Sequence, residues 1–242
     1  MRGTYAHSGS LGLGLVVVPI AGALTSLLLS IVYAYINVYS PIVGIISILV
    51  LVGYAFGLVL MLSLAARFAK VRNSGFMVLM GALIGLFALY TSWAAFLAVL
   101  LGKAGVEGAS YLSMLANPVG LWEATQLINS TGWYSVKGST PSGAVLWVIW
   151  GVEALVILGG GVMGGLASIS DSVFCEGCNE WAEEAEPPAL FALPSDRREL
   201  EQALTQAGSG DLEALSGLAS SGPVLGAYLQ TELLRCESCD AT

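Results

Sequence analysis

Residues 144–169 read AVLWVIWGVEALVILGGGVMGGLASI, an apolar stretch in which Glu153 is the single charged side chain. About 20 apolar residues are enough for a helix to cross the hydrocarbon core of a bilayer, so this stretch predicts a transmembrane helix. The whole chain agrees, because 56% of its 242 residues are hydrophobic, 11% are charged and the mean hydropathy is +0.78. Soluble globular proteins carry about twice this share of charge, and disordered chains are poor in apolar residues. We therefore expect an integral membrane protein.

Three further apolar stretches precede this one and are also long enough to span a membrane. The pattern predicts a mainly α fold, in which a four-helix transmembrane bundle over residues 1–170 is followed by a small α+β soluble domain over residues 171–242. Residues 102–143 would form a long loop between the third and fourth spans. The four expected spans cover residues 11–36, 42–69, 76–101 and 144–169.

Basic residues indicate the orientation of these spans. The short loop between the second and third spans carries Arg67, Lys70 and Arg72, whereas the loop between the first two spans is uncharged. Short loops rich in Lys and Arg stay on the cytoplasmic side of a membrane. With four spans, the N-terminus and the C-terminus are both expected in the cytoplasm, and the chain is expected to be a multi-pass protein of the cell membrane.

The external loop is expected to hold one or two short amphipathic helices along the outer interface. Apolar residues recur there at helical spacing on both sides of Asn117-Pro118. A partly ordered loop is the alternative. Aromatic residues toward the span ends are expected to form a belt at the lipid–water interface. These residues are Tyr33, Tyr35, Tyr39, Trp147 and Trp150.

Glycine pairs four residues apart are expected to bring the helices close together. Helices in lipid associate by close packing rather than by burial from water, and small residues permit close approach. The same glycine faces could also contact other chains, so we expect homo- or hetero-oligomers. For the dense glycine run in the fourth span, the alternative is a role as a hinge or as a segment that lines an ion pathway. The pairs are Gly53/Gly57, Gly81/Gly85, Gly160/Gly164 and Gly161/Gly165.

Glu153 is the one acidic residue expected deep in the membrane, about ten residues into the fourth span. One interpretation is a proton or cation site. The other, which we favour because no internal repeat is evident, is a neutral carboxyl that donates a hydrogen bond between helices. Counting along the other spans predicts an intramembrane polar site at this depth, formed by Glu153 with Ser26, Tyr54, Thr91 and Ser92.

The region after the last span is strongly acidic. Residues 171–242 carry a net charge of −11, whereas residues 1–170 carry +3, which together give the −8 of the whole chain. Nucleic-acid binding relies on basic groups that face phosphates, so we expect no nucleic-acid partner.

All four cysteines of the chain lie in this acidic region, as the pairs Cys175/Cys178 and Cys236/Cys239. Two Cys-x-x-Cys pairs can supply the four thiolates of a tetrahedral Zn²⁺ site, and Gly177 is expected to permit the turn inside the first pair. Because a cytoplasmic domain is kept reduced, a structural zinc ion is favoured over disulfides. The sequence therefore predicts a zinc site formed by the four cysteines.

The two pairs are separated by 57 residues, more than in a compact zinc ribbon. The intervening residues predict a helix near Leu200 to Leu204 that begins at a Ser195-Asp196 cap, a second short helix over 211–218 and a strand over 224–234. The cysteine pairs, within Phe174–Trp181 and Arg235–Asp240, resemble those of small bacterial polytopic membrane proteins that carry a split zinc ribbon in the cytoplasm after their last span. That resemblance implies a structural metal and no particular activity.

Three alternatives for the cysteines remain open. A rubredoxin-like iron site uses the same four thiolates but typically has Pro and Gly within its cysteine pairs, which this chain matches poorly. A thioredoxin-like redox pair needs an α/β domain that the tail does not predict. The cysteines could also be unliganded.

These patterns favour a non-enzymatic function. The chain has one histidine, His7, and no motif of a nucleophilic, phosphate-binding or metalloprotease site. We expect a membrane scaffold or adaptor whose cytoplasmic zinc domain docks a protein partner. The alternative is a small transporter or channel subunit that uses Glu153.

Overall fold

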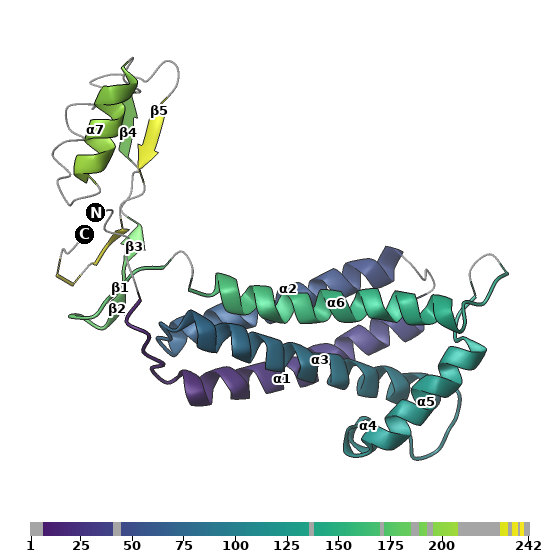
Figure 1. The fold of residues 1–242 in the computed structure, drawn as a ribbon. Coiled ribbons are helices and arrows are strands. Elements are labelled where there is room, and N and C mark those ends of the chain that lie inside the picture. Colours follow the sequence, from purple (N-terminus) through teal and green to yellow (C-terminus); the bar gives the residue numbers. More distant parts are fainter. Residues whose placement is uncertain are drawn as a thin grey trace. The chain divides into compact units, whose positions relative to one another are not determined.

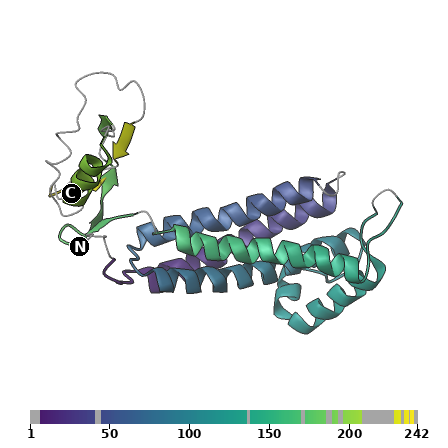
Figure 2. The same ribbon diagram turned by 45° about the horizontal axis from the view of Figure 1, so that its top comes forward.

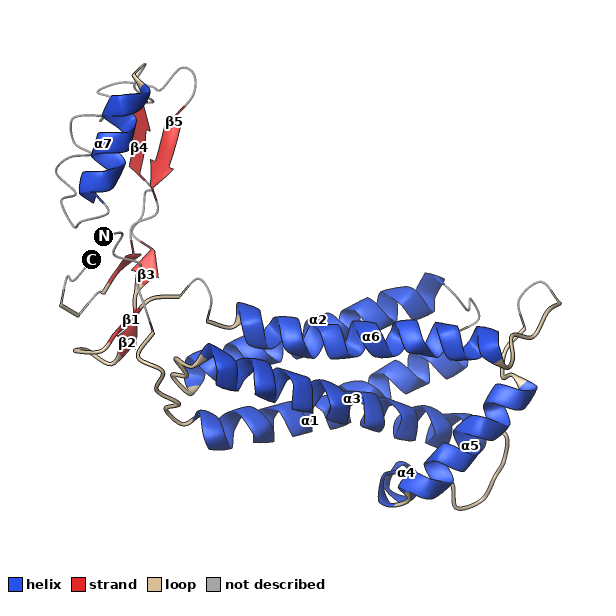
Figure 3. Cartoon of the chain, viewed as in Figure 1, coloured by secondary structure: helices blue, strands red, loops and turns tan. Residues whose placement is uncertain are grey.

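A computed structural model describes residues 7–40, 45–135, 138–169, 172–184, 189–192, 196–207, 228–231, 234–236 and 238–239 (Figure 1). The chain divides into two compact units: one comprises Gly9–Asp171, and the other comprises Met1–Ser8 with Ser172–Thr242. Figure 3 shows that the first unit is built from helices and that the second combines a helix with short strands. Each unit is described by itself below.

Four long apolar helices form the first unit, as the sequence predicts. They are α1 (Gly14–Tyr39), α2 (Ile45–Phe68), α3 (Ser74–Lys103) and α6 (Ala144–Ala167), and each is long and apolar enough to cross a membrane. Their outward faces carry large apolar side chains that are more than half exposed, such as Leu28, Phe56 and Leu155. A continuous apolar surface of this kind is expected where lipid, not water, is the solvent.

The four helices form a bundle in which each packs mainly against two others. Helix α1 packs against α2 and α3, and α6 packs against the same two helices, whereas α2 and α3 make few direct contacts (Figure 2). One contact crosses between α2 and α3, where the Tyr54 hydroxyl donates a hydrogen bond of 3.0 Å to the carbonyl of Ala88. The bundle is therefore held together by α2 and α3, each of which contacts both α1 and α6.

Glycines bring α6 into direct backbone contact with α3. A Cβ atom added at Gly81 would overlap the carbonyl oxygen of Gly161, and one added at Gly165 would overlap that of Met77. We call the contact formed by Gly81, Gly85, Gly161 and Gly165 the glycine seam. It confirms close packing as one use of these residues, although it leaves any further use of the glycine run untested.

The other glycine pairs behave differently. Gly160 lies against Ala55 of α2, and Gly164 lies against Val59 of the same helix. A Cβ atom added at Gly57 would meet the Leu29 side chain of α1, whereas one added at Gly53 would meet no described atom of another helix within 4 Å. Among the described residues, Gly53 therefore makes no close helix contact of the kind expected.

The loop between α2 and α3 is fastened to the segment that precedes α1. The Leu13 amide donates to the Ala69 carbonyl at 2.9 Å, and the Arg72 amide donates to the Ser10 carbonyl at 2.7 Å. Gly12 has a φ of +51°, and an added Cβ would overlap the Ala69 carbonyl oxygen, so only glycine fits there. Asn73 caps α3 by accepting a hydrogen bond of 2.8 Å from the Phe76 amide.

Two short helices fill the loop between α3 and α6, where the sequence predicts them. Helix α4 (Tyr111–Ala116) begins with a reciprocal cap between Ser110 and Ser113, and α5 (Pro118–Thr131) begins at Asn117, which accepts from the Gly120 amide. Leu121 and Ile128 of α5 are buried against the end of the bundle. These helices therefore pack on the bundle as well as presenting an outer apolar face.

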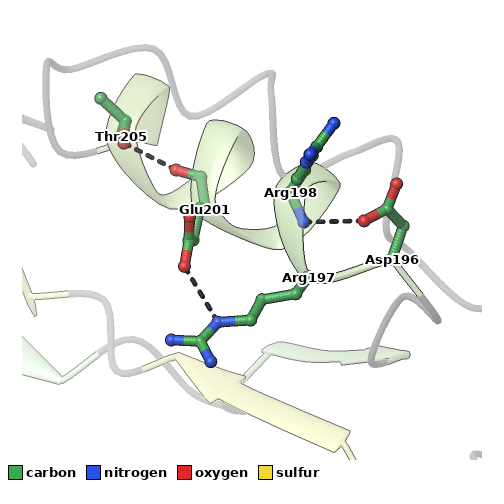
Figure 4. A network of polar contacts seen from close by, with 5 residues as sticks. All are labelled: Asp196, Arg197, Arg198, Glu201 and Thr205. Carbon is green, nitrogen blue, oxygen red and sulfur yellow. Dashed lines mark hydrogen bonds and ion pairs between the residues drawn. The ribbon is translucent and has the colours of Figure 1, made fainter.

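The described residues of the second unit form short antiparallel strand pairs and one helix. Strand β4 (Ala189–Ala192) pairs with β5 (Tyr228–Thr231), inside the region where a strand is expected. Helix α7 (Arg197–Ala207) begins at Asp196, whose carboxylate accepts a hydrogen bond of 2.9 Å from the Arg198 amide (Figure 4). The predicted helix over 211–218 and the Ser195 part of the predicted cap lie outside the described residues.

Candidate metal centre

The first cysteine pair lies in a tight hairpin. Strand β1 (Phe174–Cys175) pairs antiparallel with β2 (Glu180–Trp181), with Cys175 opposite Glu180. The residue that takes the left-handed conformation is Asn179, with a φ of 58°, and not Gly177. The expectation that Gly177 permits this turn is therefore wrong; asparagine, which tolerates this conformation better than most residues, does so immediately after Cys178.

A second pair of strands brings the distant cysteines to the first pair. Strand β3 (Glu183–Glu184) follows β2 almost directly and pairs antiparallel with β6 (Leu234–Arg235). Cys236 is the next residue after β6, so this pairing places Cys236 and Cys239 beside the hairpin. The Ser238 hydroxyl adds a link by donating a hydrogen bond of 2.6 Å to the Glu180 carboxylate.

The four sulfurs gather at one point. All four Sγ atoms lie within 4.8 Å of one another, and the Sγ atoms of Cys175 and Cys239 are 3.6 Å apart. In a tetrahedral zinc site with bonds of about 2.3 Å, neighbouring sulfurs are about 3.8 Å apart. A disulfide bond would need about 2.05 Å, and none of the four cysteines forms one. The donor set and its spacing therefore fit a single metal ion, such as zinc, without rearrangement of the strands.

The thiols already interact with one another and with the backbone. The Cys178 amide, followed by the thiols of Cys239 and Cys236, lowers the pKa of Cys175 to about 7. Hydrogen bonds with the same two thiols raise the pKa of Cys178 above its ordinary value. The thiolate is the form of cysteine that binds metal. As the pH rises, Cys175 therefore becomes a thiolate before Cys178 does.

An aromatic pair supports the hairpin from one side. The rings of Phe174 and Trp181 meet edge to face with centroids 5.0 Å apart, and Phe174 is buried. Cys236 is also buried, whereas Cys239 is exposed. The cluster therefore lies at the edge of a small apolar patch and keeps one side open to solvent.

The residues expected at the depth of Glu153 do not all face it. Ser26 donates to Gly22 in its own helix, Tyr54 donates to Ala88, and Thr91 donates to Ala88 and Ser26, so these three lie among α1, α2 and α3. Ser92 does line a cavity of about 470 Å³ together with Glu153. The structure thus brings Ser92 to the same cavity as Glu153 and places the other three residues elsewhere.

Other residues around Glu153 were not expected there. Tyr33 and Trp150, assigned from the sequence to the interfacial belt, are buried and line the cavity, whereas Tyr35 and Tyr39 are more than half exposed. Asn37 and the loop residues Trp133 and Tyr134 also line it. Tyr33 and Asn37 are four residues apart in α1 and therefore lie on one face of that helix, a signal that could have grouped these two residues.

Comparison with known proteins finds no matching family model, no matching curated protein and no matching solved structure. What the chain binds therefore has to be inferred from the geometry of its own residues. Of the two sites, the cysteine cluster has the more specific chemistry, because four converging thiols have few uses other than holding a soft or borderline metal ion.

Proposed function

We propose that this protein is a membrane-anchored adaptor in which a structural zinc ion organises a cytoplasmic domain that docks a protein partner. The convergence of four free cysteine sulfurs within 4.8 Å supports this proposal most directly. All four positions of a tetrahedral ion would be filled by protein ligands, which is typical of structural rather than catalytic zinc. Such a role requires no catalysis, in line with the absence of catalytic motifs from the sequence.

Zinc is favoured over iron by the residues between the cysteines. The first pair encloses Glu176 and Gly177, and the second encloses Glu237 and Ser238, without the proline of a rubredoxin-like site. Zinc would also stabilise a region that has few large apolar residues. Coupled binding and folding at such sites supplies on the order of 10 kcal/mol, which is comparable to the whole stability of a small domain.

The position of the metal explains how a docking surface would be held. Residues 179–235, which include β4, α7 and β5, connect the first cysteine pair to the second. An ion bound by both pairs closes this segment into a loop and restrains its two ends. The acidic character of residues 171–242 favours a protein partner with a basic surface over nucleic acid or an anionic lipid surface.

The proposal is tested first by metal analysis of the full chain purified in detergent. Elemental analysis is expected to give about one zinc per chain, and the variant with Cys236→Ser and Cys239→Ser is expected to lose it. Glu237→Asp is the matched control, since it changes a residue between the same two cysteines without removing a thiol or a charge. Less than a tenth of an equivalent of zinc in the native chain, or iron in its place, would contradict the assignment.

The docking role needs a second readout. Proteins that copurify from native membranes are quantified by mass spectrometry for the native chain, for the double cysteine variant and for Glu237→Asp. A partner is expected at a constant ratio to the native chain and to the Glu237→Asp variant, and at least tenfold depleted with the cysteine variant. If the zinc is present but no partner depends on it, the adaptor role is wrong while the metal site stands.

A further inference from the structure

The cavity beside Glu153 lies in the half of the bundle that carries α4 and α5. Its wall is formed by the C-terminal part of α1, the start of α2, the second half of α3 and the first half of α6, closed by the loop after α5. The volume of about 470 Å³ falls within the range of about 300–1,000 Å³ that is usual for small-molecule sites. A small molecule of drug-like size therefore fits inside.

Aromatic rings make up one side of this cavity. Trp93 meets Trp150 edge to face at 4.7 Å between centroids, and Phe96 meets Trp133 in the same way at 4.9 Å. Tyr134 continues the row, with its ring 4.8 Å from that of Trp133. Because each ring is held by its neighbour, the wall is preformed and needs little ordering when a ligand binds.

The loop that contributes Trp133 and Tyr134 is fixed at both ends. Gly132 ends α5 with a φ of +75°, which turns the chain back toward the bundle. The Asn129 side chain donates a hydrogen bond of 2.9 Å to the Gly143 carbonyl, and the Gly143 amide donates one of 2.8 Å to the Asn129 carbonyl. This reciprocal pair joins the end of α5 to the start of α6, and the adjoining residues Trp133 and Tyr134 line the cavity.

Among the described residues of the cavity wall, none places a positive group opposite Glu153. Among the described residues that line the cavity there is no Lys, Arg or His, and the Glu153 carboxyl has no hydrogen bond or ion pair to a described residue. Two polar side chains of the wall are hydrogen-bonded within their own helices: Asn37 donates to the Tyr33 carbonyl and Ser92 to the Leu89 carbonyl. Burial, and then the charge of Glu153, raise the pKa of Tyr134 above its ordinary value, so that its hydroxyl stays un-ionised.

We propose that this cavity binds a lipophilic organic cation, with Glu153 as its counter-charge and the aromatic wall as its cation–π partner. A carboxylate inside the membrane is costly unless a positive charge compensates it, and the described cavity wall supplies none. Aromatic rings attract quaternary ammonium and similar ions through their negative faces, most strongly where water is excluded. The Glu153 carboxylate would repel an anion, whereas a bound cation would favour the ionised form of this carboxyl. The site is independent of the proposed adaptor role, since it uses no residue of the metal centre.

The test compares two probes of the same shape and opposite charge. The chain is reconstituted into nanodiscs of zwitterionic lipid, and binding of tetraphenylphosphonium and of tetraphenylborate is measured by equilibrium dialysis against protein-free nanodiscs. Saturable binding of tetraphenylphosphonium is expected, with tetraphenylborate at least tenfold weaker. Equal binding of the two ions, or no saturable binding of the cation, would overturn the proposal.

Two matched pairs of variants assign the binding to these residues. Glu153→Gln is expected to weaken tetraphenylphosphonium binding at least tenfold, whereas Glu123→Gln, the same change at an exposed position on α5, is expected to leave it unchanged. Trp93→Leu is expected to weaken it, whereas Trp122→Leu, at a side chain that is 56% exposed, is not. Cation binding that survives Glu153→Gln at native affinity would show that the site lies elsewhere. Size-exclusion profiles matched to the native chain establish that the variants are folded.

Discussion

At Gly81 the backbone itself is the contact surface, because the α3 and α6 backbones meet there with no side chain between them. Gly81→Ala is expected to destabilise the bundle by about 1–3 kcal/mol, the usual cost of forcing an extra carbon into a packed interior. The thermal midpoint in detergent, followed by size-exclusion chromatography after heating, is expected to fall by several degrees.

Gly159→Ala is the control for this prediction. Position 159 also lies within the α6 glycine run, but an added Cβ meets no described atom within 4 Å. Alanine favours helix over glycine by up to about 1 kcal/mol, so this variant is expected to be as stable as the native chain or slightly more stable. Equal losses at positions 81 and 159 would show that the glycine seam does not hold α3 against α6.

Single residues also mark where reasoning from the sequence stops. Counting along a span gives the depth of a residue, but it does not give the direction in which the side chain points around the helix axis. Ser26, Tyr54, Thr91 and Ser92 were therefore expected with Glu153 because of their depth, yet only Ser92 lines the same cavity. Trp133 and Tyr134 could not be assigned to it, because a loop position has no helical phase.

At the scale of elements, helix α7 has both an N-terminal cap and an exposed ion pair, and the cap is expected to contribute more to the stability of the helix. Asp196 accepts the Arg198 amide at the start of the helix, whereas the Arg197–Glu201 pair, at 3.0 Å, joins side chains that are 89% and 63% exposed (Figure 4). Loss of a cap costs about 1 kcal/mol, and loss of an exposed i,i+4 pair costs about 0.3–0.5 kcal/mol.

Asp196→Ala is therefore expected to lower the stability of α7 more than Glu201→Ala does. Hydrogen exchange on the full chain in detergent is the measurement. About fivefold faster exchange is expected for the α7 amides in Asp196→Ala, and about twofold faster exchange in Glu201→Ala. Similar effects in the two variants, or a larger one in Glu201→Ala, would contradict this ranking.

The elements were predictable where one physical signal dominates. The four spans follow from long apolar runs and were expected within three residues of their observed bounds. Helical spacing on both sides of Asn117-Pro118 predicts one or two short helices in the loop that holds α4 and α5, without their bounds. The short strands β1, β2, β3 and β6 were not, because two-residue strands are too short for any alternation of side chains to show. Their pairing depends on contacts between residues far apart in the sequence.

At the scale of the whole molecule, the basic residues Arg67, Lys70 and Arg72 predict the orientation of the bundle. In a bacterial host, green fluorescent protein fused after Thr242 is expected to fluoresce, because it folds only in the cytoplasm. Alkaline phosphatase inserted after Gly138 is expected to be active, because it requires the opposite side. If alkaline phosphatase fused after Thr242 were active instead, the orientation would be opposite to the predicted one. The cysteines would then lie in an oxidising compartment, where disulfides become the favoured state.

The glycine seam also bears on how the chain is made. Helices α1, α2 and α3 leave the ribosome well before α6, since α4, α5 and their loops must be synthesised in between. A late helix with long side chains along this face would have to separate α2 from α3, or repack both, in order to enter. Because Gly81 and Gly85 carry no side chains, α6 can pack against α3 without such a rearrangement. Trp150 and Glu153 of α6 line the cavity, so the cavity is complete only after this last helix has been made.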